Sequence, residues 1–407
     1  MNDKRMCENV RQRFPLPITS REHMLRILCL ALLALCPLPL NAGFIPEILI
    51  DPEDGMIDAS RYLASARGFL PVPIIITEPA VGYGLGASVA YFHSVQELDP
   101  SEHKHRPPPS ISFGVGGYTE NETYFYGGGH FGVWKDDHVR YLGLLFKINL
   151  NAKYYGLNAG LLPSSLIEFK GVNFNLDGEL LYQSVKFRLK ESNWFVGTSY
   201  LFNDSRALFK LDANVAVPQI IRPELLDGFF RSAGVGVSLE YDGRNTIFTT
   251  TQGTQFELLY TDYGDTWGGD FDYGLLEAKF RQYIPFGDFS HLGIRLESAN
   301  LNGSAPFFAY PFVQLRGIPA LRYEGRRVLT SELEYLWGFT PRWSIAFFAG
   351  AGRTVGAARD ELIDRTVFAG GVGVRYRLAR ALGLQAGLDL ARGPEDTAVY
   401  LTVGSAW

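Results

Sequence analysis

The sequence predicts an all-β protein whose fold is a transmembrane antiparallel β-barrel of about sixteen strands. Apolar and polar residues alternate along most of the chain after residue 71, in runs of about 10–13 residues. Side chains on a strand point to opposite faces in turn, and a strand that crosses a membrane needs about 9–11 residues. After residue 42 the chain has no apolar run long enough for a membrane-spanning helix. Only a closed sheet then satisfies every backbone group in lipid.

The alternation is clearest in residues 142–150, 274–284, 292–297 and 382–390. In the first run, Leu142, Leu144 and Phe146 share one face, while Lys147 and Asn149 share the other. We expect the apolar face to contact lipid and the charged face to line the lumen. A soluble sandwich also alternates, but it has shorter strands. The charged residues expected on inward faces are Lys147, Lys186, Arg188, Lys279, Arg281, Arg295, Arg375, Arg377, Glu277, Glu297 and Asp389.

Sixteen runs qualify as strands, an even number, as a single-chain bacterial barrel requires. Their ranges are 72–77, 83–95, 109–119, 122–133, 138–150, 178–190, 193–203, 231–242, 254–263, 272–284, 289–300, 327–337, 342–352, 366–377, 381–391 and 397–406. A further run, 207–216, is either strand or loop, so the count holds to within about two. Tight connections alternate with long insertions at 96–108, 151–177, 204–230, 264–271, 301–326 and 353–365.

The first 42 residues are predicted to be a signal peptide. Arg21 and Arg26 flank the start of the apolar run 27–36, and residues 40–42 offer a small-residue cleavage site before Gly43. The run is too short to span a bilayer as a stable helix, although a membrane anchor is the alternative. The polar stretch 1–23 is either a long n-region or upstream sequence ahead of a true start at Met24.

Residues 43–70 are predicted to be a short periplasmic lead-in, and residues 71–407 to be the barrel. A turn cluster at 51–55 precedes apolar residues, Ile57 among them, that fit one or two amphipathic helical turns. Asp58 or Ser60 would cap such a helix. We expect it to lie at the barrel mouth or to enter the lumen, and a solvated tether is the equal alternative.

The last strand carries a signal of its own. Val399, Leu401, Val403 and Trp407 are expected on one face of it. An aromatic C-terminus on an amphipathic last strand resembles the signal that outer-membrane assembly machinery recognises, although Ser405 departs from the usual apolar residue. An ordinary edge strand is the alternative, and Trp407 also suits a membrane–water boundary. The sequence therefore predicts a multi-pass barrel in the cell outer membrane of a Gram-negative bacterium.

Composition and motifs argue against several other functions. The formal net charge is −5, whereas nucleic-acid binding needs a basic excess. All three cysteines lie in the first 36 residues, so the predicted barrel has no disulfide and no thiolate metal site. The chain has no His-Glu-x-x-His and no Gly-x-Ser-x-Gly motif, and His103 and His105 lie in a Pro-rich loop expected to be solvated. We therefore expect no enzymatic activity, no metal and no cofactor.

Three local patterns point to one family. The first is residues 69–84, and the second is a strand–turn–strand element with Asp242, Arg244, Asn245 and Gly253. The third is a loop motif with Arg316, Gly317, Pro319, Tyr323 and Gly325. They resemble the first hairpin, the Asp-x-Arg-Asn…Gly element and the Arg-Gly-Phe/Tyr motif of the BamA/TamA-type surface-antigen barrels. The resemblance covers about residues 69–407.

The resemblance implies a place and a partner for the loop motif. In that family the motif lies in an extracellular loop between strands eleven and twelve, which folds back into the lumen. A Glu on strand twelve and an Asp on the next strand hold its arginine. Glu334 matches the first position, the second falls at Gly350, and Glu332 is the expected substitute. The alternative is that Arg316 is a solvated loop residue.

The resemblance also implies a function. Family members that insert or export proteins carry periplasmic POTRA domains before the barrel, and residues 43–70 are too few for one. We therefore expect a POTRA-less barrel that supports outer-membrane protein assembly or translocation with a separate periplasmic or lipoprotein partner. A porin-like channel for small solutes is the alternative. We also expect a monomer in outer-membrane lipid that the assembly machinery inserts and that binds no nucleic acid.

Overall fold

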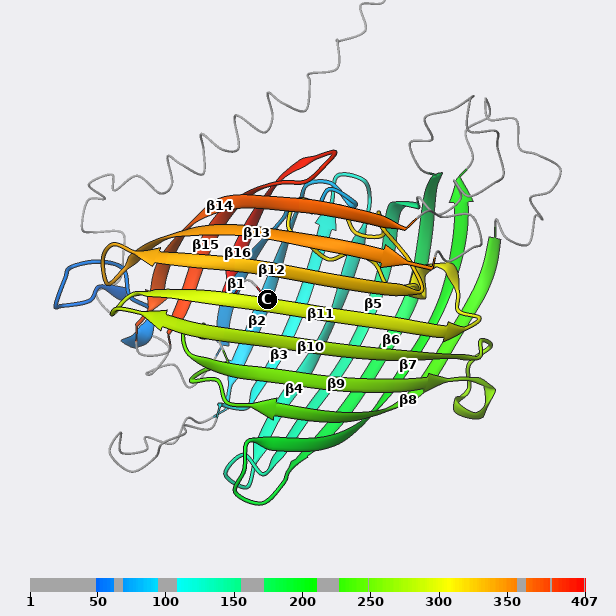
Figure 1. Ribbon diagram of the computed structural model, residues 1–407, viewed down its shortest axis with the longest axis horizontal. Helices are drawn as coiled ribbons and strands as arrows, with labels where there is room; N and C mark the ends of the chain where they lie inside the picture. The colour runs from blue at the N-terminus through cyan, green and yellow to red at the C-terminus, as the bar shows by residue number, and fades with distance from the viewer. Residues whose placement is uncertain are drawn as a thin grey trace, which may run out of the picture.

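The structure is a single sixteen-stranded antiparallel sheet that curls into a nearly closed barrel (Figure 1). The computed structural model describes residues 49–61, 69–93, 108–154, 172–210, 227–247, 249–356, 364–380, 383–405 and 407. Each strand is hydrogen-bonded to the next one along the chain, from β1 to β16. The predicted all-β barrel of sixteen strands is therefore confirmed. Among the described residues, no helix is long and apolar enough to cross a membrane.

The strands form in sequence order with short turns at one end and longer connections at the other. Their bounds are β1 Phe69–Ile76, β2 Gly84–Phe92, β3 Ile111–Thr119, β4 Tyr124–Trp134, β5 Val139–Tyr154, β6 Val172–Arg188, β7 Trp194–Lys210, β8 Asp227–Asp242, β9 Gly253–Tyr263, β10 Tyr273–Phe286, β11 Ser290–Gly303, β12 Arg327–Gly338, β13 Trp343–Val355, β14 Arg365–Ala379, β15 Leu384–Arg392 and β16 Thr397–Val403. We call the end with the β4–β5, β10–β11 and β12–β13 turns the turn end, and the opposite end the loop end.

Strands β5 to β8 are longer than the sequence pattern predicts. Each has 16 or 17 residues, whereas about 9–11 suffice to cross a membrane. The insertions expected at 151–177 and 204–230 are therefore shorter, and β7 absorbs the first part of the uncertain run 207–216. Residues 211–216 lie outside the described part of the chain. The added length lies at the loop end, where the pattern changes because outward residues become polar.

The register corrects the orientation predicted for 142–150. Directly opposed residues share a face, and Arg140 pairs with Lys186 while Phe146 pairs with Leu180. The apolar column of β5 therefore shares the inner face with Lys186, and Lys147 points outward, so the prediction was wrong for this strand. Lys147 forms an ion pair with Asp177 of β6. Asp177 lies in the added length of β6, and its ion pair accounts for a charged residue in the middle of the outer face of β5.

The two terminal strands meet without a backbone ladder. β1 and β16 lie next to each other (Figure 1), yet the described residues show no paired positions between them. β16 has only 7 residues, and β1 contains Pro71 and Pro73, which lack the N–H group that a ladder needs. The barrel therefore has one weak seam, between β1 and β16.

Residues 49–58 form a small hairpin around the turn cluster predicted at 51–55, and the helical turns predicted after it fall mostly on residues outside the described part of the chain. Ile50 and Ile57 form an antiparallel bridge, and the backbone N–H of Asp51 donates to the carbonyl of Met56 over 2.8 Å. Helical backbone begins only at Ser60, whose N–H donates to Asp58 Oδ1 over 2.6 Å. Residues 43–48 and 62–68 lie outside the described part of the chain, as does the predicted signal peptide. We call residues 49–58 the N-terminal hairpin.

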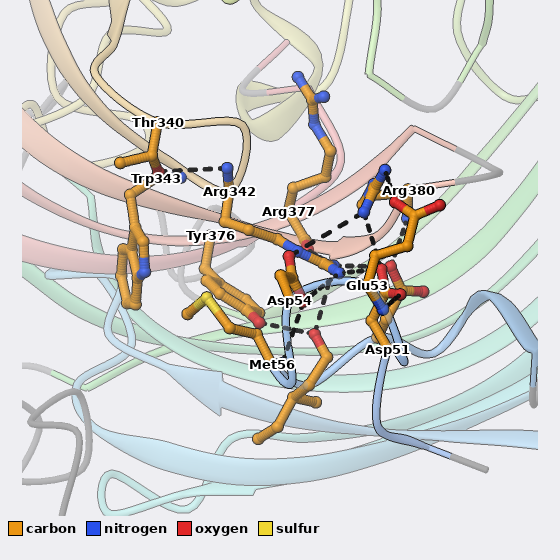
Figure 2. Close-up of polar contacts among 12 residues, drawn as sticks. Asp51, Glu53, Asp54, Met56, Thr340, Arg342, Trp343, Tyr376, Arg377 and Arg380 are labelled. Carbon is orange, nitrogen blue, oxygen red and sulfur yellow. Dashed lines mark hydrogen bonds and ion pairs between the residues drawn. The ribbon is translucent and has the colours of Figure 1, made fainter.

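The N-terminal hairpin is fixed to the turn end of the barrel by charge (Figure 2). Arg342, in the β12–β13 turn, donates to Asp54 over 2.7 Å and to Asp58 over 2.6 Å. Arg380, in the β14–β15 turn, donates to Asp51 over 2.8 Å. The backbone N–H of Ala59 also donates to the carbonyl of Leu378 over 2.7 Å. The hairpin therefore lies on the rim and is not a free tether.

Candidate functional site

The connection between β11 and β12, residues 304–326, lies on the inner face of the barrel, and we call it the lumen loop. Its short 3-10 turn, Phe307–Ala309, packs aromatic rings against the inner face at the loop end. Phe307 lies 5.3 Å from Phe174 and 5.0 Å from Phe209 between ring centroids. Tyr154 lies 4.9 Å from the same ring. This apolar contact holds the first part of the loop against β5, β6 and β7.

The second part of the lumen loop is held by Arg316. Its guanidinium donates to Glu332 over 2.7 and 2.9 Å, to Glu334 over 2.7 Å and to Asp389 over 2.8 Å. Glu332 and Asp389 are 2 % and 0 % exposed, so these carboxylates have lost most of their water. A buried charge is costly unless it is paired, and here each oxygen finds a cationic donor. The expected partners Glu332 and Glu334 are thus next to Arg316, and Asp389 joins them.

On β13, Gly350 stands at the position where the BamA/TamA-type barrels have a second carboxylate. Phe348 and Gly350 contact the lumen loop there in another way. The Arg316 guanidinium lies 3.5 Å from the centroid of the Phe348 ring, in a cation–π contact. Gly350 leaves space for Leu315, because a Cβ at position 350 would lie 2.6 Å from Leu315 Cδ2. The absent carboxylate is supplied from β15 by Asp389. Sequence reasoning placed Asp389 inside the lumen but did not pair it with Arg316.

Two more arginines bind the same carboxylates. Arg295 of β11 donates to Glu332 over 3.1 Å, and Arg375 of β14 donates to Asp389 over 3.0 Å. Glu297 accepts a hydrogen bond from Arg295 over 2.6 Å. The network joins β11, β12, β14 and β15 through the lumen loop. Removing one member therefore leaves a buried charge without its partner.

Gly317 and its neighbours fix the tip of the loop against β15 and β16. Gly317 has a φ of +90°, and a Cβ there would lie 2.8 Å from the backbone of Arg392, so only glycine fits. Its N–H donates to Tyr400 Oη over 3.0 Å. Pro319 follows, and the N–H of Ala320 donates to Glu78 in the β1–β2 connection over 3.1 Å. The loop tip thus bridges both strands of the seam.

Tyr323 and Gly325 hold the return path of the loop. The Tyr323 hydroxyl donates to Glu395, and its carbonyl accepts from Val313 over 2.9 Å. The N–H of Gly325 donates to the carbonyl of Pro311 over 3.0 Å. All five residues of the loop motif therefore lie in one folded unit. Of these five, only Arg316 contacts the carboxylates of Glu332, Glu334 and Asp389.

The predicted strand–turn–strand element lies at the turn end, away from Arg316. Asp242 accepts from Arg244 over 2.9 Å and from Arg140 of β5 over 2.7 Å. Asn245 closes the turn, since its Oδ1 accepts from the Thr251 N–H over 3.2 Å. Gly253 has a φ of +113° and lies against the carbonyl of Gly243, which leaves no room for a Cβ. The element is a charged turn at the turn end of the lumen.

Trp407 departs from the face predicted for it. Leu401 and Val403 point outward, and Val399 shares their side of β16, but Gly404 has a φ of +89° and turns the chain inward. Trp407 lies 5.5 Å from Tyr283 between ring centroids, on the inner face.

Gln385 and Ser405 hold this turned tail. The Gly404 N–H donates to the carbonyl of Gln385 over 2.8 Å. Ser405, an unusual residue at its position, accepts from the Thr250 N–H over 3.2 Å. A Cβ at Gly293 of β11 would lie 2.5 Å from the Trp407 ring, so a small residue makes the space for it. The C-terminus therefore helps to fill the lumen at the turn end.

A cavity of about 860 Å³ lies at the loop end beside the seam. It is lined by the β1–β2, β3–β4 and β15–β16 connections and by Pro319 of the lumen loop. Glu78 reaches its wall, and burial raises the pKa of that carboxyl. Its lining is mixed, with Asn121, Asn151 and Glu395 beside apolar residues such as Ala152 and Phe174.

The sequence did not indicate a small polar cluster that lies on the outer face. Ser112 Oγ lies 2.9 Å from His93 Nε2 and 2.8 Å from His130 Nδ1, near the turn end. Within the described ranges no carboxylate contacts either imidazole, so the third group that orients a catalytic histidine is missing there. In the same part of the chain, no group of three or more His, Cys, Asp or Glu residues is arranged to hold a metal ion.

Comparison with known proteins relates this geometry to solved barrels. BamA from Haemophilus ducreyi lacking POTRA domains 1–3 superposes with a TM-score of 0.53 and 12 % identity, over 83 % of this chain and 70 % of that one. The chain has the fold of a BamA-type barrel. CdiB from Acinetobacter baumannii superposes with a TM-score of 0.53 and 9 % identity, over 82 % of this chain and 59 % of CdiB. No protein-family model and no curated protein sequence matches the chain.

Proposed function

We propose that this BamA-type barrel resides in the outer membrane of a Gram-negative bacterium and supports the assembly of proteins in that membrane or their translocation across it. The observation that carries the proposal is Arg316, which is bound by Glu332, Glu334 and Asp389 and keeps the lumen loop inside the barrel. A barrel built for free diffusion has no need of four strands joined through one loop. The resident loop supports a barrel that acts through its wall or its seam.

The outer face supports the membrane location. Large apolar side chains point outward on strands all around the sheet, with Leu85 71 % and Leu145 63 % exposed. Tyr335, Trp337 and Phe339 lie on the same surface near the turn end. Aromatic residues of this kind suit the boundary between membrane and water. Lipid covers this surface in the proposed location.

The seam supports a role in assembly. β1 and β16 lie side by side without a ladder, so both present backbone groups that a further strand can bind. An extended segment that adds to such an edge gains main-chain hydrogen bonds whatever its sequence. The lumen loop touches both sides of the seam, because Gly317 bonds to Tyr400 and Ala320 bonds to Glu78. Loop position and seam opening are therefore mechanically linked in this proposal.

We infer that a separate periplasmic protein or lipoprotein delivers the clients. The turn end offers a charged rim for it, since Arg380 is 37 % exposed at its side chain while it contacts the N-terminal hairpin. Glu53 is 72 % exposed beside it. A partner that binds this rim would contact the hairpin and the β14–β15 turn together.

The test is assembly of an unfolded outer-membrane barrel protein into vesicles that contain the full chain. We expect client folding, seen as a heat-modifiable band, to be several-fold faster than in empty vesicles, and Arg316→Ala to remove most of that gain. Arg322→Ala is the matched control in the same loop, because Arg322 makes a half-exposed ion pair with Glu395 over 3.3 Å. Equal rates with wild type, Arg316→Ala and empty vesicles would refute the assembly role.

The cavity of about 860 Å³ favours the second candidate, a channel for small solutes. It is a space of mixed polar and apolar lining at the loop end, large enough for water and small solutes. The lumen loop and Trp407 lie further along that path and oppose passage. Solute uptake by vesicles that contain the wild-type chain separates the two candidates, because a channel admits small sugars and a plugged barrel excludes them.

A further inference from the structure

The inner face of the barrel is divided between an apolar and a charged side. The register places Ile74 of β1, Phe113 of β3, Phe131 of β4, Leu144 and Phe146 of β5, and Leu180 of β6 on the same face as the lumen loop and its carboxylates. We call these six residues the apolar wall. A barrel filled with water would normally present polar side chains at such positions.

The apolar wall is only partly covered. Its residues are half-buried, whereas Phe174 and Phe209, where the lumen loop packs, are buried. The loop therefore covers the loop end of the inner face and leaves the apolar wall with accessible surface. An accessible apolar surface on the inner face of a barrel is a candidate binding surface.

Glycines on the neighbouring strands let the side chains of this surface pack against the backbone. A Cβ at Gly129 would lie 2.6 Å from Leu144 Cδ2 and 3.1 Å from the Phe113 ring. A Cβ at Gly127 would lie 2.6 Å from the Phe146 ring. Because these positions lack side chains, the side chains of Phe113, Leu144 and Phe146 occupy the space that a Cβ would fill and lie close to the backbone.

The charged side extends over β8 to β12 and reaches β5 and β6 at the turn end. Lys186 bonds to Glu240 over 2.7 Å and to Glu257 over 2.6 Å. Arg140, directly across from Lys186, bonds to Asp242. Cationic and anionic groups alternate here, which suits a zwitterionic group better than a single charge.

We propose that the apolar wall binds one acyl chain of a zwitterionic phospholipid that enters from the bilayer through the β1–β16 seam. The column from Leu142 to Ile148 is about 20 Å long, at about 3.3 Å per residue. One leaflet of a hydrocarbon core is about 15 Å thick, so the column accommodates an acyl chain. The wall reaches the seam at β1, and the mixed charges near Arg140 lie where the headgroup would end. The proposal does not depend on the assembly role.

The test uses the cysteine-free barrel. All three cysteines precede residue 43, so a full chain with Cys7, Cys29 and Cys36 changed to Ser carries no thiol. Into it are placed Leu144→Cys or Phe146→Cys on the apolar wall, Leu145→Cys on the outer face, and Lys279→Cys on the charged side. Each is labelled with a benzophenone maleimide in phosphatidylethanolamine vesicles and irradiated. Only heat-modifiable protein is scored, and intact mass counts the attached lipid.

We expect lipid attachment at 145, which faces the bilayer, and attachment at 144 and 146 at least several-fold above that at 279. Attachment at both inner positions no higher than at 279 would overturn the proposal. In phosphatidylglycerol vesicles we expect attachment at 144 and 146 to fall several-fold while attachment at 145 stays the same. Equal attachment from the two lipids at the inner positions would overturn the zwitterionic specificity.

Discussion

At the scale of single residues, the lumen loop depends on the guanidinium of Arg316. Three carboxylates from β12 and β15 converge on it, and Phe348 covers its face. Arginine suits this position because its planar fork can donate to several oxygens at once, which the ammonium of lysine cannot reproduce.

Arg316→Ala is therefore expected to destabilise the barrel. It leaves Glu332, Glu334 and Asp389 with one cation fewer, and breaking a buried pair on one side costs about 3–5 kcal/mol. Urea unfolding followed by heat-modifiability measures the loss, and protease cleavage within the lumen loop should rise with it. Arg316→Lys should recover part of the stability. Unchanged unfolding together with unchanged loop cleavage would show that the loop is not held by this residue.

Trp407 gives a second prediction at this scale. Because its ring lies on Tyr283 and over Gly293 inside the lumen, Trp407→Ala should lower the free energy of unfolding of the assembled barrel by about 2 kcal/mol. Val403→Ala, at an outward position of β16, is the control and should have a smaller effect in detergent. If Trp407 served only as an assembly address, the variant would assemble slowly but unfold like wild type.

At the scale of elements, the charge pattern of the sequence did not reveal that the N-terminal hairpin contacts the barrel. Asp51, Asp54 and Asp58 surround Arg342, which is buried in the β12–β13 turn. The hydrogen bond from Arg342 holds the pKa of Asp54 below its usual value. Burial opposes this at Asp58, but hydrogen bonds from Ser60 and Arg342 outweigh it, so the pKa of Asp58 is lowered as well.

The hairpin should therefore detach on acidification. Lowered carboxyl pKa values stabilise the folded contact above the unfolded value of 3.8 and lose that stabilisation as the pH falls through the lowered values. Hydrogen exchange or limited proteolysis of residues 49–61 should show protection at neutral pH and its loss below about pH 3.8. Arg342→Ala should release the segment at every pH. Protection that persists in Arg342→Ala would assign the docking to backbone contacts.

The predicted strand faces are right where the inner face is polar and reversed where the inner face is apolar. In β12, Glu332 and Glu334 face inward while Leu333 and Tyr335 face outward, as the alternation indicates. In β5 the same alternation gave the opposite orientation, because the inner face is apolar there and Lys147 lies on the outer face in an ion pair with Asp177. Period-two patterning identifies two faces but does not say which of them is inside.

Candidate site residues were predictable to the extent that they lie near each other in sequence. The spacing of Glu332 and Glu334 on one strand face places both beside a loop that ends at residue 326. Asp389 lies on a distant strand, so only the closure of the barrel brings it to Arg316. The face of Trp407 was predicted wrongly for a related reason. The positive φ of Gly404 turns the chain, and the alternation of apolar and polar residues does not indicate such a turn.

At the scale of the whole molecule, the barrel is obstructed from both ends. The lumen loop enters from the loop end, while Trp407 and the 243–252 turn close the turn end. The seam between β1 and β16 is the remaining discontinuity in the wall. Under the proposed function, such a barrel acts through its wall and its seam and not through an open lumen.

The conductance of the full chain in planar lipid bilayers measures whether the lumen is obstructed. Wild type should show little steady current, because the Arg316 network keeps the lumen loop in place. Arg316→Ala should show frequent, larger openings, and Arg322→Ala should behave like wild type. A large and steady current from wild type, unchanged by Arg316→Ala, would contradict the account and favour an open channel.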